Sequence, residues 1–329
     1  MQNNLTKKEI DNLYNWAKKY DIKELKTKDK NKLLNIKELT LGELFRAEKN
    51  FSYIPNAIFK LVNIKELYIN SINLKALPKD IGNLINLEEL VIGGDCKLKK
   101  LPKEIGKLTN LKKLEIRCEK LNELPKELFN LTNLKSIIIS CDKLVKLPKE
   151  ICNFSKLENI EIACENLKEL PHEIGNLKKL KYFTLWESNL KKIPKEFGNL
   201  INLESFSIYS CILKEFPKEI TNFTKLIHLT IECYKMKELP REIGNLINLK
   251  SLYIKSANLK ELPKEIKNLV NLERIDIIWD GYAKRLPNEI LNFEKLKFIE
   301  IKKLGFIYKS VGRKYKIEKA KKKIKKNIF

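Results

Sequence analysis

The sequence predicts an α/β solenoid, in which one short structural unit is repeated along most of the chain. Three observations support this fold class. Prolines recur at a fixed spacing, an alternating apolar run recurs at the same spacing, and each proline opens a segment with helical signals. All 11 prolines of the 329 residues are separated by 23 or 24 residues, at Pro55, Pro78, Pro102, Pro125, Pro148, Pro171, Pro194, Pro217, Pro240, Pro263 and Pro287.

Twelve runs with a strand pattern begin between Ile36 and Leu296. In each run the first, fourth and sixth residues are apolar, as in Leu249, Leu252 and Ile254, and their neighbours are mostly polar. This alternation is typical of a strand with one buried face. Strands that recur in one direction need a return segment between them, so they must be parallel. We therefore expect one parallel sheet of about 12 strands.

The return segments carry the signals of a short helical turn. In Pro102 to Gly106, proline fixes φ at the first position and Glu104 lies near the positive end of the turn. Gly106 then ends the turn. The segments are too short for long helices, so we expect single turns of helix, including 3₁₀ turns, on the side opposite the strands.

Residues 6 to 20 form a predicted amphipathic helix. Thr6 to Glu9 has the form of a capping box. The apolar residues that follow at helical spacing are Ile10, Leu13, Ala17 and Tyr20, with Trp16 beside them. A solenoid exposes an apolar cross-section at each end, and this helix is placed to cover the first one. We expect a helical cap over residues 1–35, a solenoid over 36–304 and a basic C-terminal cap or tail over 305–329.

The repeated phrase LxxLxIxxxxLxxLPxEIxxLxxL resembles the leucine-rich repeat family. The resemblance is closest to the variant with LPxEI in each unit, which occurs in intracellular Ras-group proteins and many bacterial proteins. It covers about residues 36 to 304. It implies a right-handed horseshoe with parallel strands on the concave side, short convex turns, and a scaffold that binds proteins.

The chain departs from the family at the turn after each strand. The family commonly places Asn three residues after the sixth strand position, where it forms an internal ladder. Here that position holds other residues, such as Glu119, Asp142 and Glu165. Asparagine lies one place later at Asn73, Asn166, Asn189 and Asn258. The hydrogen bonds of these turns must therefore be satisfied differently.

Targeting signals and cysteine content favour a cytoplasmic protein. The formal net charge is +24, and much of it lies in residues 302 to 329. No apolar run is long enough to cross a bilayer, and residues 1 to 8 lack the apolar core of a signal peptide. Seven cysteines, an odd number, argue against a complete disulfide framework.

Six cysteines each follow a strand and are expected to form a column. Equivalent side chains in neighbouring coils point the same way about 4.8 Å apart, whereas a disulfide needs converging side chains. We therefore expect no disulfides, and the absence of a CxxC pair argues against a zinc site. The six are Cys96, Cys118, Cys141, Cys164, Cys211 and Cys233.

The sequence shows no enzyme signature. The chain has only two histidines, and no glycine-rich phosphate loop appears. We expect no catalytic residues, no cofactor, no metal and no small-molecule substrate.

The candidate site lies on the concave face, where the repeats differ from each other. Aromatic residues mixed with charged ones on a rigid sheet match the composition of binding hot spots. They predict a protein or peptide partner, although exposed aromatics also stabilise neighbouring strands through cross-strand packing. The candidate residues are Tyr182, Trp186, Tyr209, His228, Glu232, Tyr253, Arg274, Asp276 and Trp279.

The first coils of the same face have a different character. Glu38, Glu43, Glu66 and Glu89 make this part acidic, and the next outward positions are small or isolated. We therefore expect an aromatic-anchored site to lie toward the seventh to eleventh strands.

The C-terminal tail supports an alternative function. Its lysines between Lys319 and Lys326 are interleaved with Ile317, Ala320 and Ile324 at helical spacing. Such a basic amphipathic segment attracts nucleic acid or anionic membrane, which would make the protein an electrostatic adaptor. The same apolar stripe also suits a cap on the last coil.

Overall fold

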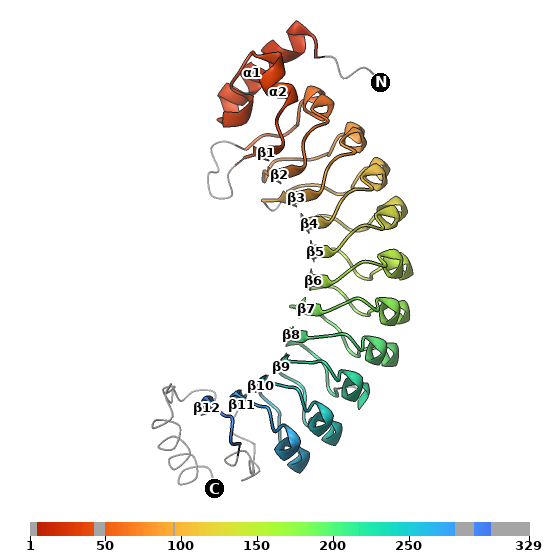
Figure 1. Ribbon diagram of the computed structural model, residues 1–329, viewed down its shortest axis with the longest axis vertical. Coiled ribbons are helices and arrows are strands. Elements are labelled where there is room, and N and C mark those ends of the chain that lie inside the picture. The colour runs from red at the N-terminus through yellow and green to blue at the C-terminus, as the bar shows by residue number, and fades with distance from the viewer. Residues whose placement is uncertain (1–4, 43–49, 95, 217, 280–292, 304–329) are drawn as a thin grey trace. The chain divides into compact units, whose positions relative to one another are not determined.

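The computed structural model describes residues 5–42, 50–94, 96–216, 218–279 and 293–303. The chain divides into two compact units, Met1–Asn166 and Leu167–Phe329, which we call unit 1 and unit 2. In each unit the strands lie on one side of the coils and the short helical turns on the other (Figure 1). The tail beyond residue 303 lies outside the described residues.

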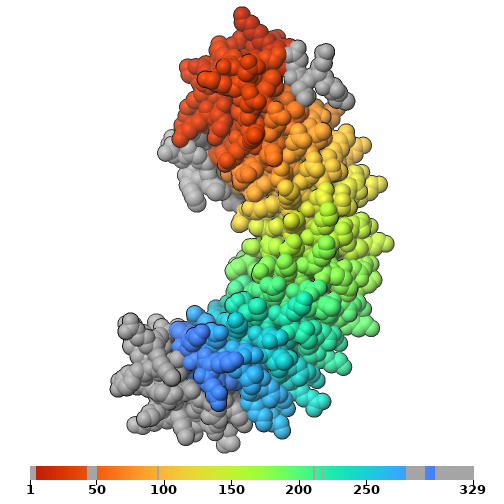
Figure 2. All heavy atoms as spheres, viewed as in Figure 1, coloured from red at the N-terminus to blue at the C-terminus, as the bar shows by residue number. Residues whose placement is uncertain are grey.

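Unit 1 begins with the predicted helical cap. Helix α1 spans Lys7–Tyr20, and its first turn is closed by Thr6 and Glu9. The backbone N–H of Glu9 donates to the Thr6 hydroxyl (3.2 Å), and the backbone N–H of Thr6 donates to the Glu9 carboxylate (2.9 Å). Glu9 also pairs with Lys60 of the first coil at 2.6 Å. Figure 2 shows this cap, in red, over the end of the first coils.

Six strands follow in unit 1, and each pairs in parallel with the next. Between α1 and β1 lie a 3₁₀ turn, η1 (Lys23–Leu25), and a short helix, α2 (Lys30–Leu34). The strands are β1 (Glu38–Leu41), β2 (Glu66–Asn70), β3 (Glu89–Gly93), β4 (Lys113–Arg117), β5 (Ser136–Ser140) and β6 (Asn159–Ala163). The 3₁₀ turns between them are η3 (Asn56–Lys60), η4 (Lys79–Asn83), η5 (Lys103–Lys107), η6 (Lys126–Asn130) and η7 (Lys149–Asn153).

Unit 2 repeats the arrangement. Its neighbouring strands are again parallel. They are β7 (Tyr182–Trp186), β8 (Ser205–Cys211), β9 (His228–Cys233), β10 (Ser251–Ser256), β11 (Arg274–Trp279) and β12 (Phe298–Lys303). The 3₁₀ turns are η8 (His172–Asn176), η9 (Lys195–Asn199), η10 (Lys218–Asn222), η11 (Arg241–Asn245) and η12 (Lys264–Asn268). The 12 strands, the 3₁₀ turns and the helical cap confirm the predicted fold class.

Each proline that the structure describes opens a 3₁₀ turn, as the sequence predicts. Pro102 precedes η5, and its carbonyl accepts the backbone N–H of Ile105 at 3.1 Å. Ile105 is fully buried, so the apolar side of the turn faces the core. Gly106 is required by close packing, because a Cβ atom there would lie 2.3 Å from the carbonyl oxygen of Glu127 in the next coil.

Asparagine ladders supply the hydrogen bonds between coils. At the turn after the strand, Asn166 donates to the carbonyl of Asp142 at 2.8 Å, and Asn258 donates to that of Tyr234 at 2.7 Å. A second ladder precedes the strands, where each asparagine side chain donates to a carbonyl of the preceding coil. Its members are Asn63, Asn86, Asn110 and Asn133 in unit 1 and Asn202, Asn248 and Asn271 in unit 2.

The prediction that the cysteines form no disulfide is wrong. Cys96 and Cys118 are bonded, with their Cα atoms 5.1 Å apart. The prediction assumed equivalent positions, but these two cysteines are 22 residues apart in a coil that spans 24. Gly94, at φ 77°, turns the chain back before Cys96. The two side chains therefore converge from non-equivalent positions.

The spacing of the other cysteines also bears on whether they are free or bonded. Cys141 and Cys164 are one full period apart and remain free thiols. Burial raises the pKa of each thiol to about 12, so both stay protonated. Cys233 is also disulfide-bonded. The β8 strand carries a register shift just before Cys211.

No described helix has both the length and the apolar character that crossing a bilayer requires.

Candidate functional site

The outward side chains of β7 to β11 form the surface that we call the unit 2 face. Each strand contributes three outward positions, and parallel register aligns the first two into rows from β7 to β11. The third position completes a looser row, because β8 and β9 shift register after Ile208. The first row is Tyr182, Ser205, His228, Ser251 and Arg274. The middle row is Thr184, Ser207, Thr230, Tyr253 and Asp276. The third row is Trp186, Tyr209, Glu232, Lys255 and Ile278.

An aromatic pair dominates the third row. The rings of Trp186 and Tyr209 are stacked, with centroids 3.9 Å apart and planes 7° from parallel. Although they stack, Trp186 remains 36% exposed and Tyr182, on the same strand, is 44% exposed. The Tyr182 hydroxyl donates to Glu204 at 3.3 Å. Cross-strand packing therefore occurs, and it still leaves aromatic surface facing solvent.

Charged residues on this face neutralise each other. Lys255 pairs with Glu232 at 2.8 Å and lies 5.4 Å above the centre of the Tyr234 ring. The hydrogen bond to Glu232 raises the pKa of Lys255 above its usual value, so the ammonium stays charged. The Tyr234 hydroxyl donates to the same carboxylate at 2.5 Å. Our sequence reasoning overlooked Tyr234, which directly follows β9.

A second pair forms on β11. The Arg274 guanidinium donates to Asp276 at 2.6 Å and lies 4.0 Å above the centre of the Phe298 ring. Asp276 is only 2% exposed. Of these two candidate residues, only Arg274 is exposed to a partner, because Asp276 is buried.

The remaining candidate residues differ in accessibility. His228 is exposed, and Tyr253 is half-buried, which raises the pKa of its hydroxyl. The Trp279 backbone pairs opposite Ser256 at the end of β11, but its side chain lies outside the described residues. The structure thus brings Trp186 and Tyr209 together and separates them from the Arg274 pair.

Small hydroxyl residues cover the rest of the surface. Thr184, Ser207 and Thr230 lie side by side in the middle row and are half-buried. Their hydroxyls form no hydrogen bond with any residue that the structure describes. They offer donors and acceptors to a bound molecule.

The corresponding face of unit 1 is charged. Lys113 pairs with Glu89 at 2.7 Å, and Arg117 pairs with Glu115 at 2.5 Å. The Tyr68 hydroxyl donates to Glu66 at 2.8 Å, and burial is the main cause of its raised pKa. Glu66 and Glu89 belong to this face, but Lys113 neutralises Glu89, so the described face carries charges of both signs. Glu43 lies outside the described residues.

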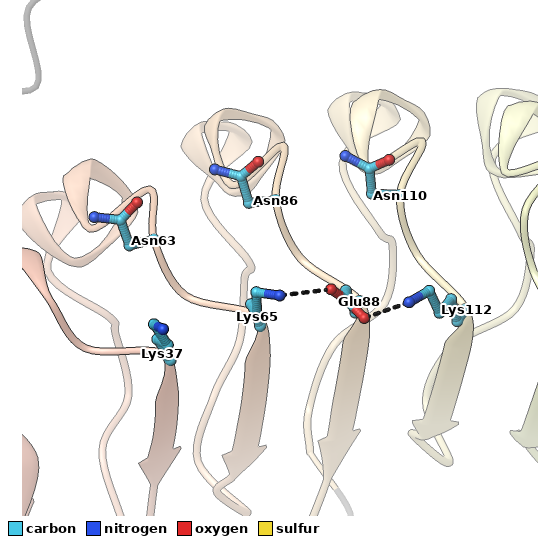
Figure 3. Close-up of a pocket in the computed structure, with 7 residues that line it drawn as sticks. All are labelled: Lys37, Asn63, Lys65, Asn86, Glu88, Asn110 and Lys112. Carbon is cyan, nitrogen blue, oxygen red and sulfur yellow. Dashed lines mark hydrogen bonds and ion pairs between the residues drawn. The ribbon is translucent and has the colours of Figure 1, made fainter.

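A shallow pocket lies beside the strand starts of unit 1 (Figure 3). Glu88 bonds to Lys65 at 3.0 Å and to Lys112 at 2.5 Å, and these lysines hold the pKa of Glu88 below its usual value, Lys112 most strongly. Asn63, Asn86 and Asn110 lie along the opposite side of the pocket (Figure 3). Because its charges pair internally and its asparagines stabilise the coils, we assign this pocket to the framework.

The described residues contain no group of three or more His, Cys, Asp or Glu side chains suited to hold a metal ion.

Comparison with known proteins identifies the repeat. A family model described as a leucine-rich repeat region matches residues 17–144, 94–179 and 163–252, which together make up more than half of the chain. The chain therefore belongs to the leucine-rich repeat family. A comparison with curated proteins gives no match.

Solved structures show the same fold. An internalin from Listeria monocytogenes is 17% identical, with a TM-score of 0.52 over 91% of this chain and 98% of that one. A TDR receptor is 20% identical, with a TM-score of 0.59 over 82% of this chain and 48% of that one. Internalin C2 from the same Listeria species is 18% identical, with a TM-score of 0.51 over 66% and 92%. At these identities the likeness concerns the fold alone.

Proposed function

We propose that this protein is a non-enzymatic interaction module that binds a protein or peptide partner on the unit 2 face. The solenoid provides a rigid scaffold of aligned strands. On that scaffold the outward residues vary from coil to coil while the buried ones repeat. Recognition therefore falls to the outward residues.

The exposed Trp186–Tyr209 stack carries the proposal. Aromatic side chains bury large areas on binding at little cost in conformational entropy, and tryptophan and tyrosine are enriched among residues that dominate binding energy. The stack fixes both rings before a partner arrives. The other residues that we assign to the surface are Tyr182, His228, Glu232, Tyr253 and Arg274; Asp276 is buried, and the side chain of Trp279 lies outside the described residues.

The test removes the stack from the full-length chain. A Trp186→Ala/Tyr209→Ala variant should bind the partner captured from the producing cells at least about tenfold more weakly. It should keep the circular dichroism spectrum of the wild type, because both side chains lie on the surface. The matched control is Arg117→Ala/Ser140→Ala, which changes the same row position on two neighbouring strands of unit 1. Equal capture by the stack variant and the wild type would refute the proposal.

The alternative function concerns residues mostly outside the described part. An adaptor that contacts nucleic acid or anionic membrane depends on residues 302 to 329, of which 304 to 329 lie outside the described residues. The bacterial origin and cytoplasmic location also stay predictions. The Cys96–Cys118 disulfide removes one of the arguments for the cytoplasm, because disulfides persist mainly in oxidising compartments.

A further inference from the structure

The first row of the unit 2 face alternates between large and small side chains. Tyr182, His228 and Arg274 are exposed, whereas Ser205 and Ser251, which lie between them, are half-buried. The strand register places the five residues directly side by side. The row is therefore a series of ridges and notches that repeats every two coils.

The spacing of the notches indicates which peptide conformation fits the row. Neighbouring strands lie about 4.8 Å apart, so the two notches are about 9.6 Å apart. An extended β-peptide presents equivalent side chains about every 6.6 Å, which does not match. A polyproline II helix rises about 3.1 Å per residue with three residues per turn, so its equivalent side chains recur about every 9.3 Å. Only the polyproline II repeat fits the notches.

The middle row suits the backbone of such a helix. A polyproline II helix forms no internal hydrogen bonds, and its carbonyl groups need donors. The hydroxyls of Thr184, Ser207 and Thr230 bond to no described residue, so they are available as donors. Proline has no backbone N–H, so a proline-rich segment needs few hydrogen-bond acceptors from the surface.

The third row suits the side chains. Aromatic-lined grooves are a recurring way to bind proline-rich segments, because proline rings pack flat against aromatic rings. Trp186 and Tyr209 form such a wall along the hydroxyl row. Within the three rows, Lys255 is paired with Glu232 and Arg274 with Asp276. The surface therefore favours an uncharged segment.

We propose that the partner engages the unit 2 face through an uncharged, proline-rich segment in the polyproline II conformation. The segment runs across the strands from β7 to β11 and places every third residue in the notches at Ser205 and Ser251. This inference rests on the proposed function, since it specifies the partner for the same surface.

The first measurement is direct binding by the full-length chain. The probe is a fluorescein-labelled (Pro-Pro-Ala)4 peptide, followed by fluorescence anisotropy. It should bind at least about tenfold more tightly than a (Gly-Ser-Ala)4 peptide of equal length and charge, because the proline peptide is already ordered. Equal binding of the two peptides would overturn the inference.

The second measurement fills the notches. A Ser205→Tyr/Ser251→Tyr variant should bind the proline peptide at least about tenfold more weakly, because both recesses are lost. Ser205→Ala/Ser251→Ala keeps the recesses and should bind like the wild type. Ser136→Tyr, at the same row position of unit 1, controls for folding and should also bind like the wild type. Unchanged affinity in the tyrosine double variant would contradict the proposal.

Failure of this inference is distinguishable from failure of the proposed function. If the proline peptide does not bind while Trp186→Ala/Tyr209→Ala still loses the captured partner, the face binds a partner of another kind. If cellohexaose binds and the peptide does not, the hydroxyl and aromatic rows serve a carbohydrate. Either result overturns the polyproline II proposal, and retention of the captured partner by the stack variant overturns both.

Discussion

Unit 1 and unit 2 are built from the same coil, but different side chains hold their neighbouring coils together. The second residue of each strand shows this in the core. It is aliphatic in unit 1, as at Leu114 and Ile137, and aromatic at the start of unit 2, where Phe183 and Phe206 occupy it. All four side chains are buried, so this position of the coil accepts either an aliphatic or an aromatic residue.

The phenylalanines of unit 2 form one cluster. Phe197 lies 5.0 Å from Phe183 and 5.0 Å from Phe206, measured between ring centroids, and Phe223 lies 5.7 Å from Phe197. Such edge and tilted contacts add stability beyond the buried area. The cluster lies under the strands that carry Trp186 and Tyr209. The exposed aromatic pair therefore stands on a rigid aromatic base.

Unit 1 also has polar and covalent links between coils. Glu88 joins three strand starts through Lys65 and Lys112, and Cys96 is bonded to Cys118. Its outward face carries ion pairs in place of exposed aromatic rings. The comparison indicates that ion pairs occur on the outward faces of both units, whereas the face of unit 2 adds exposed aromatic rings to them.

The largest expected effect comes from the aromatic cluster. Phe206→Ala should lower the free energy of unfolding by about 3–5 kcal/mol, because it removes a buried ring and leaves a cavity. Ile137→Val, at the same strand position of unit 1, should cost only about 1 kcal/mol. Urea unfolding followed by circular dichroism measures both. Similar losses for the two variants would show that the core of unit 2 is not specially packed.

A smaller effect is expected from the covalent link of unit 1. Cys96→Ala/Cys118→Ala should lose about 2–4 kcal/mol of unfolding free energy, because the unfolded chain is no longer cross-linked. Cys141→Ala/Cys164→Ala removes the same number of sulfurs but no bond, and should lose less. The comparison is made by urea unfolding without reducing agent. Equal losses in the two variants would contradict a stabilising role for the disulfide.

The regular part of the fold was predictable because the same buried positions recur in every coil. The proline spacing fixes where each 3₁₀ turn begins, and the capping box at Thr6 places the start of α1. The second asparagine ladder was also readable, since Asn63, Asn86 and Asn110 each precede the first apolar residue of a strand run. The family resemblance did not predict it, because the asparagine of the family lies in the turn after the strand.

The site was only partly predictable, because a period assigns a side chain to a face but not to a partner. Trp186 and Tyr209 were expected on the surface, yet their stacking depends on ring orientations that the sequence does not contain. Asp276 was expected to face a partner and is covered, because a neighbouring arginine folds over it. The prediction of no disulfide assumed that the cysteines occupy equivalent positions in neighbouring coils. Cys96 and Cys118 do not, because their coil has one extra residue.

The smallest expected effect concerns the charge links at the strand starts. Because Lys112 and Lys65 hold the folded-state pKa of Glu88 below its unfolded value, its carboxylate stabilises the fold at neutral pH. This contribution is lost as the pH falls through the folded-state pKa. Glu88→Gln should therefore lower the urea midpoint slightly at pH 7 and not at pH 2, and high salt should reduce the difference. Glu273→Gln is the matched control in unit 2, where Lys297 alone pairs with the carboxylate. Because Glu88 joins two coils and Glu273 only one, a larger pH-dependent loss for Glu273→Gln would contradict the larger contribution expected from the doubly paired carboxylate.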